Sequence, residues 1–160
     1  MGTMTTAHSA TEMKAPRKLT PELVQELFSR YTNDEGELSM AHMYPYYHED
    51  VRFQDSVQTL HGMQEFKAMG DRLLERCSQG YRMEVHSAAQ NGKKIFLHWT
   101  MHMRFMGTPW APLDGTSILT LNDEGLIVEQ RDHYDLWGDT FSVIPGISKF
   151  YAWFMQKTMG

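Results

Sequence analysis

The chain has 160 residues, 41% of them hydrophobic and 22% charged, a composition typical of one globular domain with its own core. A net charge of −5 argues against a general nucleic-acid binder, because such a protein needs a basic surface. The single cysteine, Cys77, excludes an intramolecular disulfide and indicates a reducing compartment, so we expect a cytoplasmic protein. No apolar run is long enough for a membrane-spanning helix, and residues 1–18 lack the apolar segment of a secretory signal.

The first half of the chain predicts helices around one short strand. Thr20 and Pro21 are typical of a helix start, since a hydroxyl caps the first turn and proline lacks only an N–H that is unused there. Apolar residues at helical spacing continue this helix to Tyr31. The elements predicted next are a short helix over 39–47, a strand over 51–55, a loop to residue 62 and a long helix over 64–78.

The second half changes to the apolar–polar alternation of a β-sheet. The turn sequences Asn91-Gly92 and Asn122–Gly125 separate runs in which every second residue is apolar. The predicted strands cover 81–86, 95–105, 115–121 and 126–136. Helices followed by long antiparallel strands predict an α+β fold, in which a curved mixed or antiparallel sheet wraps around three helices.

The C-terminal segment, residues 141–160, predicts one more helix. Apolar and aromatic residues follow a Pro-Gly break at helical spacing, as in an amphipathic helix. Lys149 and Lys157 are its only charges, whereas helices that lie on membranes are usually more basic. We therefore expect packing on the domain or on a partner, rather than peripheral membrane contact. The chain then divides into a disordered tail (1–18), one domain (19–140) and this helix (141–160).

Two aspartates interrupt otherwise apolar strand faces. Asp55 shares one side of its strand with Phe53, and Asp132 shares one side with Tyr134, because side chains alternate along a strand. A carboxylate that faces a core costs free energy unless it is paired or functional. Burial in a cavity would raise both pKa values toward the range useful for proton transfer. Alternatively, both are structural acids bound by backbone or arginine donors.

Three segments resemble parts of a known family. Residues 47–55 resemble its helix end and first strand, residues 60–66 a helix start after glycine, and residues 123–135 its last hairpin. In this order they resemble the nuclear transport factor 2-like superfamily, in its SnoaL-like and ketosteroid isomerase-like branch, from Leu19 to Asp139. The resemblance implies a cone-shaped α+β fold with a deep pocket between helices and sheet, commonly as a homodimer through the sheet.

The ketosteroid isomerase relatives imply one set of roles. Their general base follows the first strand, where this chain has Asp55. Their oxyanion hole uses a tyrosine of the first helix and a protonated aspartate on a later strand. The tyrosine corresponds to Tyr31 or, in another register, to Leu27, and the aspartate corresponds to Ser117. A serine donates a weaker hydrogen bond, so this departure argues against the isomerase reaction.

The polyketide cyclases and limonene epoxide hydrolases of this branch imply another set. They use an aspartate on the last strand as acid or base, and Asp132 lies at that place. The hydrolases also use an Arg-x-Asp pair on the central strand, where this chain has Trp99 and Met101, or His98 and Thr100 if the register slips by one. Because the charged pair is missing, epoxide hydrolysis is disfavoured.

Two hypotheses for the function follow, and the sequence does not decide whether the chain is an enzyme. The first is a cofactor-independent acid–base enzyme for a small apolar molecule with a carbonyl, enol or epoxide group, in which Asp132 and Asp55 are catalytic. The second is a non-catalytic protein that binds a small apolar ligand or assists a partner. No metal site is expected, since the histidines lack ligand spacing. The residues predicted to line the ligand pocket are Tyr31, Phe53, Trp99, Met101, Met103, Ser117 and Tyr134.

Overall fold

A computed structural model describes residues 15–32, 35–77, 80–104, 111–140 and 146–159. Most of the predicted disordered tail, residues 1–14, lies outside this range. The elements are α1 (Pro21–Ser29), the 3₁₀ helix η1 (Tyr44–Tyr46), β1 (Tyr47–Gln54), β2 (Thr59–His61), α2 (Gly62–Arg76), β3 (Tyr81–Asn91), β4 (Lys94–Met103), β5 (Ala111–Leu121), β6 (Ile127–Tyr134), the π-helical turn η2 (Leu136–Thr140) and α3 (Ile147–Met159).

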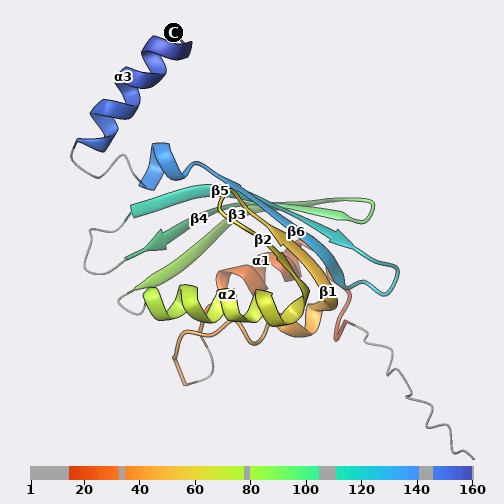
Figure 1. The fold of residues 1–160 in the computed structure, drawn as a ribbon. Coiled ribbons are helices and arrows are strands. Elements are labelled where there is room, and N and C mark those ends of the chain that lie inside the picture. The colour runs from red at the N-terminus through yellow and green to blue at the C-terminus, as the bar shows by residue number, and fades with distance from the viewer. Residues whose placement is uncertain (1–14, 33–34, 78–79, 105–110, 141–145, 160) are drawn as a thin grey trace, which may run out of the picture.

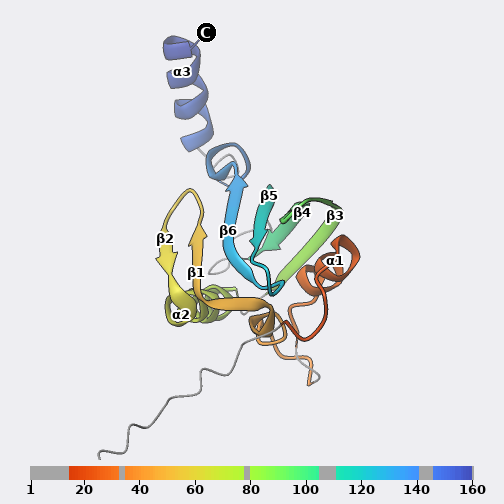
Figure 2. The same ribbon diagram turned by 90° about the vertical axis from the view of Figure 1, so that its right-hand side faces the viewer.

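The six strands form one curved, open sheet in the order β2-β1-β6-β5-β4-β3. Strands β1 and β6 are parallel, and all other neighbours are antiparallel, so the sheet is mixed. The sheet bends over α1 and α2 on its concave side (Figures 1 and 2). Helix α1 packs on β3, and α2 packs on β1. The predicted α+β fold, a curved sheet around helices with an extra C-terminal helix, is confirmed.

At the start of both helices under the sheet, a side chain accepts a hydrogen bond from a backbone amide. The Thr20 hydroxyl accepts a hydrogen bond from the Leu23 amide at 3.3 Å, which confirms the predicted start of α1. Before α2, the Glu65 carboxylate accepts a hydrogen bond from the His61 amide at 2.8 Å. Gly62 then turns the chain with a φ of +80°, a conformation that favours glycine.

Three local predictions were wrong between residues 39 and 61. The helix expected over 39–47 is only the three-residue 3₁₀ helix η1, which begins at Tyr44, because Pro45 has no N–H to donate to a preceding helical turn. Strand β1 begins four residues earlier than expected, at Tyr47. The expected loop contains β2, a short edge strand that pairs with the end of β1.

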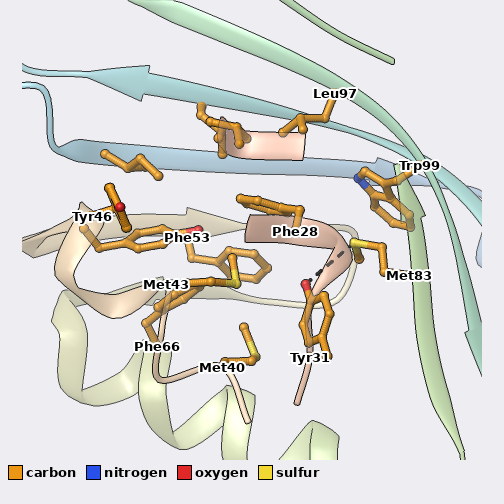
Figure 3. Packing of buried hydrophobic residues seen from close by; sticks show 14 of the residues in the cluster. Phe28, Tyr31, Met40, Met43, Tyr46, Phe53, Phe66, Met83, Leu97 and Trp99 are labelled. Carbon is orange, nitrogen blue, oxygen red and sulfur yellow. Dashed lines mark hydrogen bonds between the residues drawn. The ribbon is translucent and has the colours of Figure 1, made fainter. Parts of the chain in front are cut away.

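The core lies between the helices and the concave side of the sheet. Phe66 of α2 is 1% exposed and packs against Tyr47 and Phe53 of β1, with ring centroids 4.8 and 5.5 Å away. Figure 3 shows the rings of Phe53 and Phe66, together with Phe28 and several methionines, between the ribbons of helices and strands. Trp99 points from the sheet into the same layer (Figure 3). Aromatic and methionine side chains therefore fill much of the space between the helices and the sheet.

Helix α3 extends away from the rest of the protein in both views (Figures 1 and 2). Its aromatic residues Phe150, Trp153 and Phe154 are 66%, 53% and 48% exposed. The predicted helix is therefore present. Its packing on the domain or on a partner stays a prediction. Within the described residues, no helix is long and apolar enough to cross a membrane.

We predict that Phe66→Ala lowers the free energy of unfolding by about 3–5 kcal/mol, because it empties the centre of the core. Phe96 is the matched control, since its side chain is 40% exposed on β4. Phe96→Ala should cost about 1 kcal/mol or less. Urea unfolding followed by circular dichroism measures both values. Similar losses for the two variants would contradict this description of the core.

Candidate functional site

A cavity of about 340 Å³ lies between α1, α2 and the concave side of the sheet. Aromatic, methionine and leucine side chains make up most of its wall, as in many sites for small organic ligands. All nine residues singled out from the sequence line it, namely Tyr31, Phe53, Asp55, Trp99, Met101, Met103, Ser117, Asp132 and Tyr134. The structure thus brings the two acids into one cavity; their chemical roles stay predictions.

Asp132 projects from β6 and is bound by two neighbours. The hydroxyl of Ser117, its direct partner across the β5–β6 ladder, donates a hydrogen bond to Oδ1 at 2.7 Å. The side-chain amide of Gln130, two residues earlier on the same face, lies 3.0 Å from Oδ1 and 3.1 Å from Oδ2. The Gln130 carbonyl in turn accepts a hydrogen bond from the buried Tyr47 hydroxyl. The carboxyl group is therefore held in one orientation.

A second chain of donors reaches Asp132 through the sheet. The Trp99 indole N–H donates to the Ser117 oxygen at 2.9 Å, which leaves the Ser117 proton for Asp132. Trp99 is 1% exposed and lies against Gly115 of β5. A Cβ at residue 115 would come within 2.5 Å of the indole ring, so glycine is required for this close approach.

Burial dominates the electrostatics of Asp132. It raises the pKa of this carboxyl from 3.8 to about 6, although the hydrogen bonds from Ser117 and Gln130 act in the opposite direction. The negative charge of Asp55 raises the pKa further. A carboxyl group with a pKa near 6 has both its acid and its base form available at near-neutral pH, which is the condition for proton transfer.

Asp55 directly follows β1, and its carboxylate accepts hydrogen bonds from the turn between β1 and β2. Its Oδ1 accepts hydrogen bonds from the amides of Val57 and Gln58, each at 2.8 Å. Its Oδ2 accepts one from the Tyr134 hydroxyl at 3.0 Å. Asp55 therefore ties the β1–β2 turn to β6 and fixes the position of Tyr134 in the cavity wall.

The Tyr31 hydroxyl donates only a weak hydrogen bond on the cavity wall. It donates to the sulfur of Met83 at 3.6 Å (dashed line in Figure 3), and a thioether is a weak acceptor. The Tyr81 ring lies 4.6 Å from the Tyr31 ring. Burial raises the pKa of Tyr31 far above its usual value, and the charge of Asp132 adds to the effect. Tyr31 thus remains a neutral O–H donor within electrostatic reach of Asp132.

The register of β4 decides between two alternatives left by the sequence. Trp99 and Met101 line the cavity, whereas His98 and Thr100 lie on the other side of the sheet. There the His98 ring nitrogen lies 3.2 Å from the Asp114 carboxylate. Among the described residues, no group of three His, Cys, Asp or Glu side chains could hold a metal ion.

Four important lining residues were missed by the sequence reasoning. Gln130 has the same strand parity as Asp132, so the period of two could have placed it beside the acid. Tyr81 also lines the cavity and sits at the first position of β3. Arg72 and Arg76 of α2 had no sequence signal beyond their helical spacing.

The chain belongs to the family of the SnoaL-like domain, whose sequence model matches residues 24–130. None of the proteins with a curated description matches the chain. The family assignment therefore rests on more than half of the sequence, and it carries no particular reaction.

Solved structures with the same fold share little sequence with this chain. A candidate SnoaL-like polyketide cyclase from Jannaschia sp. CCS1 is 18% identical, with a TM-score of 0.61 over 81% of this chain and 98% of that protein. A protein of ketosteroid isomerase-like fold from Catenulispora acidiphila, solved with trimethylamine, is 16% identical, with a TM-score of 0.61 over 74% and 89%. A candidate isomerase of the SnoaL-like family from Agrobacterium tumefaciens is 21% identical, with a TM-score of 0.53 over 71% and 92%. At these identities the likeness shows the fold alone.

We predict that Asp132→Asn stabilises the protein in a pH-dependent way. Below about pH 3.8 the carboxyl is protonated in both states and its burial costs little. Between about pH 3.8 and 6 the unfolded chain loses the proton first, so stability falls as pH rises, and above pH 6 the cost is constant. The variant should melt roughly 4 °C higher at pH 7.5, and the gain should shrink toward pH 4.

Asp50→Asn is the control for this measurement, because its side chain is 86% exposed and the same charge is removed. Its melting temperature should stay within about 1 °C of the parent at each pH. Differential scanning calorimetry from pH 4 to pH 7.5 measures both variants. A gain for Asp132→Asn that does not depend on pH would contradict the assigned desolvation.

Proposed function

We propose that this chain is a cofactor-independent enzyme that moves a proton on a small apolar molecule bound in the cavity. The observation that carries the proposal is Asp132, a carboxyl held by Ser117 and Gln130 in an apolar cavity, with a pKa near 6. Active sites use burial in this way to match an acid or base to neutral pH.

The two oxygens of Asp132 differ in what they can do. Oδ1 accepts the hydrogen bond from Ser117 and the shorter contact from Gln130, so its lone pairs are engaged. Oδ2 has only the 3.1 Å contact with Gln130. We assign Oδ2 as the atom that removes a proton from a carbon next to a carbonyl or enol group and later returns it.

In this scheme the Tyr31 hydroxyl donates a hydrogen bond to the substrate oxygen and so stabilises the negative charge that develops there. This hydroxyl lies on the wall of the same cavity and gives up only a weak bond to the Met83 sulfur when it turns to a ligand. Removing one such donor from an enzyme typically lowers the rate about 10²–10³-fold. Asp55 has a positioning role in this scheme, because it holds the Tyr134 hydroxyl.

The family supports the general class of reaction. The structures of similar fold include one described as a candidate isomerase and one described as a candidate polyketide cyclase. A carbonyl or enol substrate is favoured over an epoxide, because no Arg-x-Asp pair lies at Trp99 and Met101.

A ligand-binding protein without catalysis is the second candidate. The observation that favours it is the full hydrogen bonding of Asp55, whose two oxygens accept bonds from Val57, Gln58 and Tyr134 as a structural acid would. In that case Asp132 would select ligands by accepting a hydrogen bond and would transfer no proton.

The assembly that we propose is a homodimer, as the resemblance implies. The convex side of the sheet carries Phe96 and the His98–Asp114 pair, a surface of mixed apolar and polar groups. Helix α3 would then find a partner for its exposed aromatic residues on the second copy. Sedimentation velocity of the full chain measures the oligomeric state.

Solvent deuterium uptake tests the proposed chemistry. The probes are small apolar ketones, and NMR follows the loss of their α-protons in deuterated buffer. We expect catalysed exchange with at least one ketone, and Asp132→Asn should lower its rate about 10²–10⁴-fold. Tyr31→Phe should lower it about 10²-fold or more.

Asp50→Asn is the matched control, because it removes an aspartate whose side chain is 86% exposed and does not line the cavity. It should leave the exchange rate within about twofold. The proposal is wrong if Asp132→Asn exchanges a ketone as fast as the parent does, and in that case the ligand-binding function stands.

A further inference from the structure

One side of helix α2 combines two apolar residues with two arginines. Met69, Arg72, Leu73 and Arg76 are spaced by three and four residues, so they share one side of the helix, and all four line the cavity. The same residues continue the apolar wall that starts at Phe66. The two arginines therefore lie at the C-terminal end of the apolar side of α2 that lines the cavity.

The arginines mark the opening of the cavity. Most residues that line the cavity are buried or half-buried, but three of them are exposed to solvent, namely Val57, Arg72 and Arg76. Asp132, Ser117 and Gln130 belong to the sheet on the inner side. A ligand that enters would thus pass between the last turns of α2 and the β1–β2 turn.

Both guanidinium groups are available to a ligand. Neither forms an ion pair or hydrogen bond with any residue that the structure describes. Two acids of the same helix, Asp71 and Glu75, line a different depression together with Tyr44. In the last two turns of α2 the acids and the arginines therefore line different hollows.

Helix stability does not account for this arrangement. Arg76 lies in the last turn, where a cation interacts favourably with the helix dipole. Arg72 lies one turn earlier, and like charges four residues apart destabilise a helix by about 0.2–0.5 kcal/mol. An anion between the two guanidinium groups would reverse the sign of that interaction.

We propose that the molecule bound in this cavity is an apolar carboxylic acid, whose carboxylate Arg72 and Arg76 bind at the opening. This inference rests on the proposed function of the cavity as the ligand site. Arginine binds a carboxylate through two parallel N–H donors, and two arginines can bind one carboxylate from opposite sides. The apolar body would fill the 340 Å³ behind them, and a carbonyl or enol group farther along the molecule would reach Asp132.

Binding of two probes with the same chain tests the proposal. Decanoate and 1-decanol differ only in the head group, and isothermal titration calorimetry measures both. We expect the parent protein to bind decanoate roughly tenfold more tightly than decanol, as a charge-assisted hydrogen bond provides. The preference should fall as the salt concentration rises, because the arginines are exposed.

The double variant Arg72→Gln/Arg76→Gln should lose the preference, with both probes binding within about threefold of each other. The double variant Arg17→Gln/Lys67→Gln removes the same charge from residues that do not line the cavity, and it should keep the preference. Thermal melting of all variants shows that they are folded.

The outcomes separate this inference from the proposed function. Equal binding of decanoate and decanol to the parent overturns the inference and leaves the proton-transfer proposal standing. Preference that survives in Arg72→Gln/Arg76→Gln also overturns it, because another group then selects the carboxylate. If neither probe binds, the inference is wrong and the cavity is not a site for apolar chains. A normal preference with unimpaired exchange by Asp132→Asn refutes only the catalytic role.

Discussion

The desolvation of one carboxyl group, that of Asp132, is the interaction on which the account of this protein depends. Its apolar surroundings favour the protonated form, while Ser117 and Gln130 donate to the ionised form. Burial is the larger effect, so the pKa of Asp132 is raised to about 6. Without the hydrogen bonds the pKa of this carboxyl would lie higher, and without burial it would lie lower. Either change would remove the balance that proton transfer requires.

The curved sheet supplies the geometry for this balance. Ser117 and Asp132 are direct partners in the β5–β6 ladder, so their side chains meet on the concave side. Trp99 reaches Ser117 because Gly115 leaves room for the indole ring. Helices α1 and α2 then cover the concave side, and Tyr31, which follows α1, lines the cavity together with the two arginines of α2. The site is thus assembled from backbone pairing that the fold requires in any case.

The sequence predicted the long strands and several of the residues that line the cavity, whereas its predictions for residues 39–61 were poor. Alternation in 95–105 placed Trp99, Met101 and Met103 on the inner side, and the same rule placed Asp132 with Tyr134. Residues 39–61 were assigned poorly, because the short β2 strand forms only by pairing with β1, and Pro45 overrides the helical pattern nearby. Arg72 and Arg76 could not be found in advance, since a charge on a helix is usually solvated. Their importance depends on which side of α2 faces the cavity, and that is a tertiary property.

The ionisation of Asp132 in the folded protein tests the central claim most directly. Carbon-detected NMR of the side-chain carboxyl groups, titrated from pH 3 to pH 8, follows each aspartate separately. The account predicts that the Asp132 carboxyl titrates with a midpoint near pH 6. A midpoint at or below the ordinary value of 3.8 would contradict it, because the carboxylate would then be a structural acid stabilised by its donors.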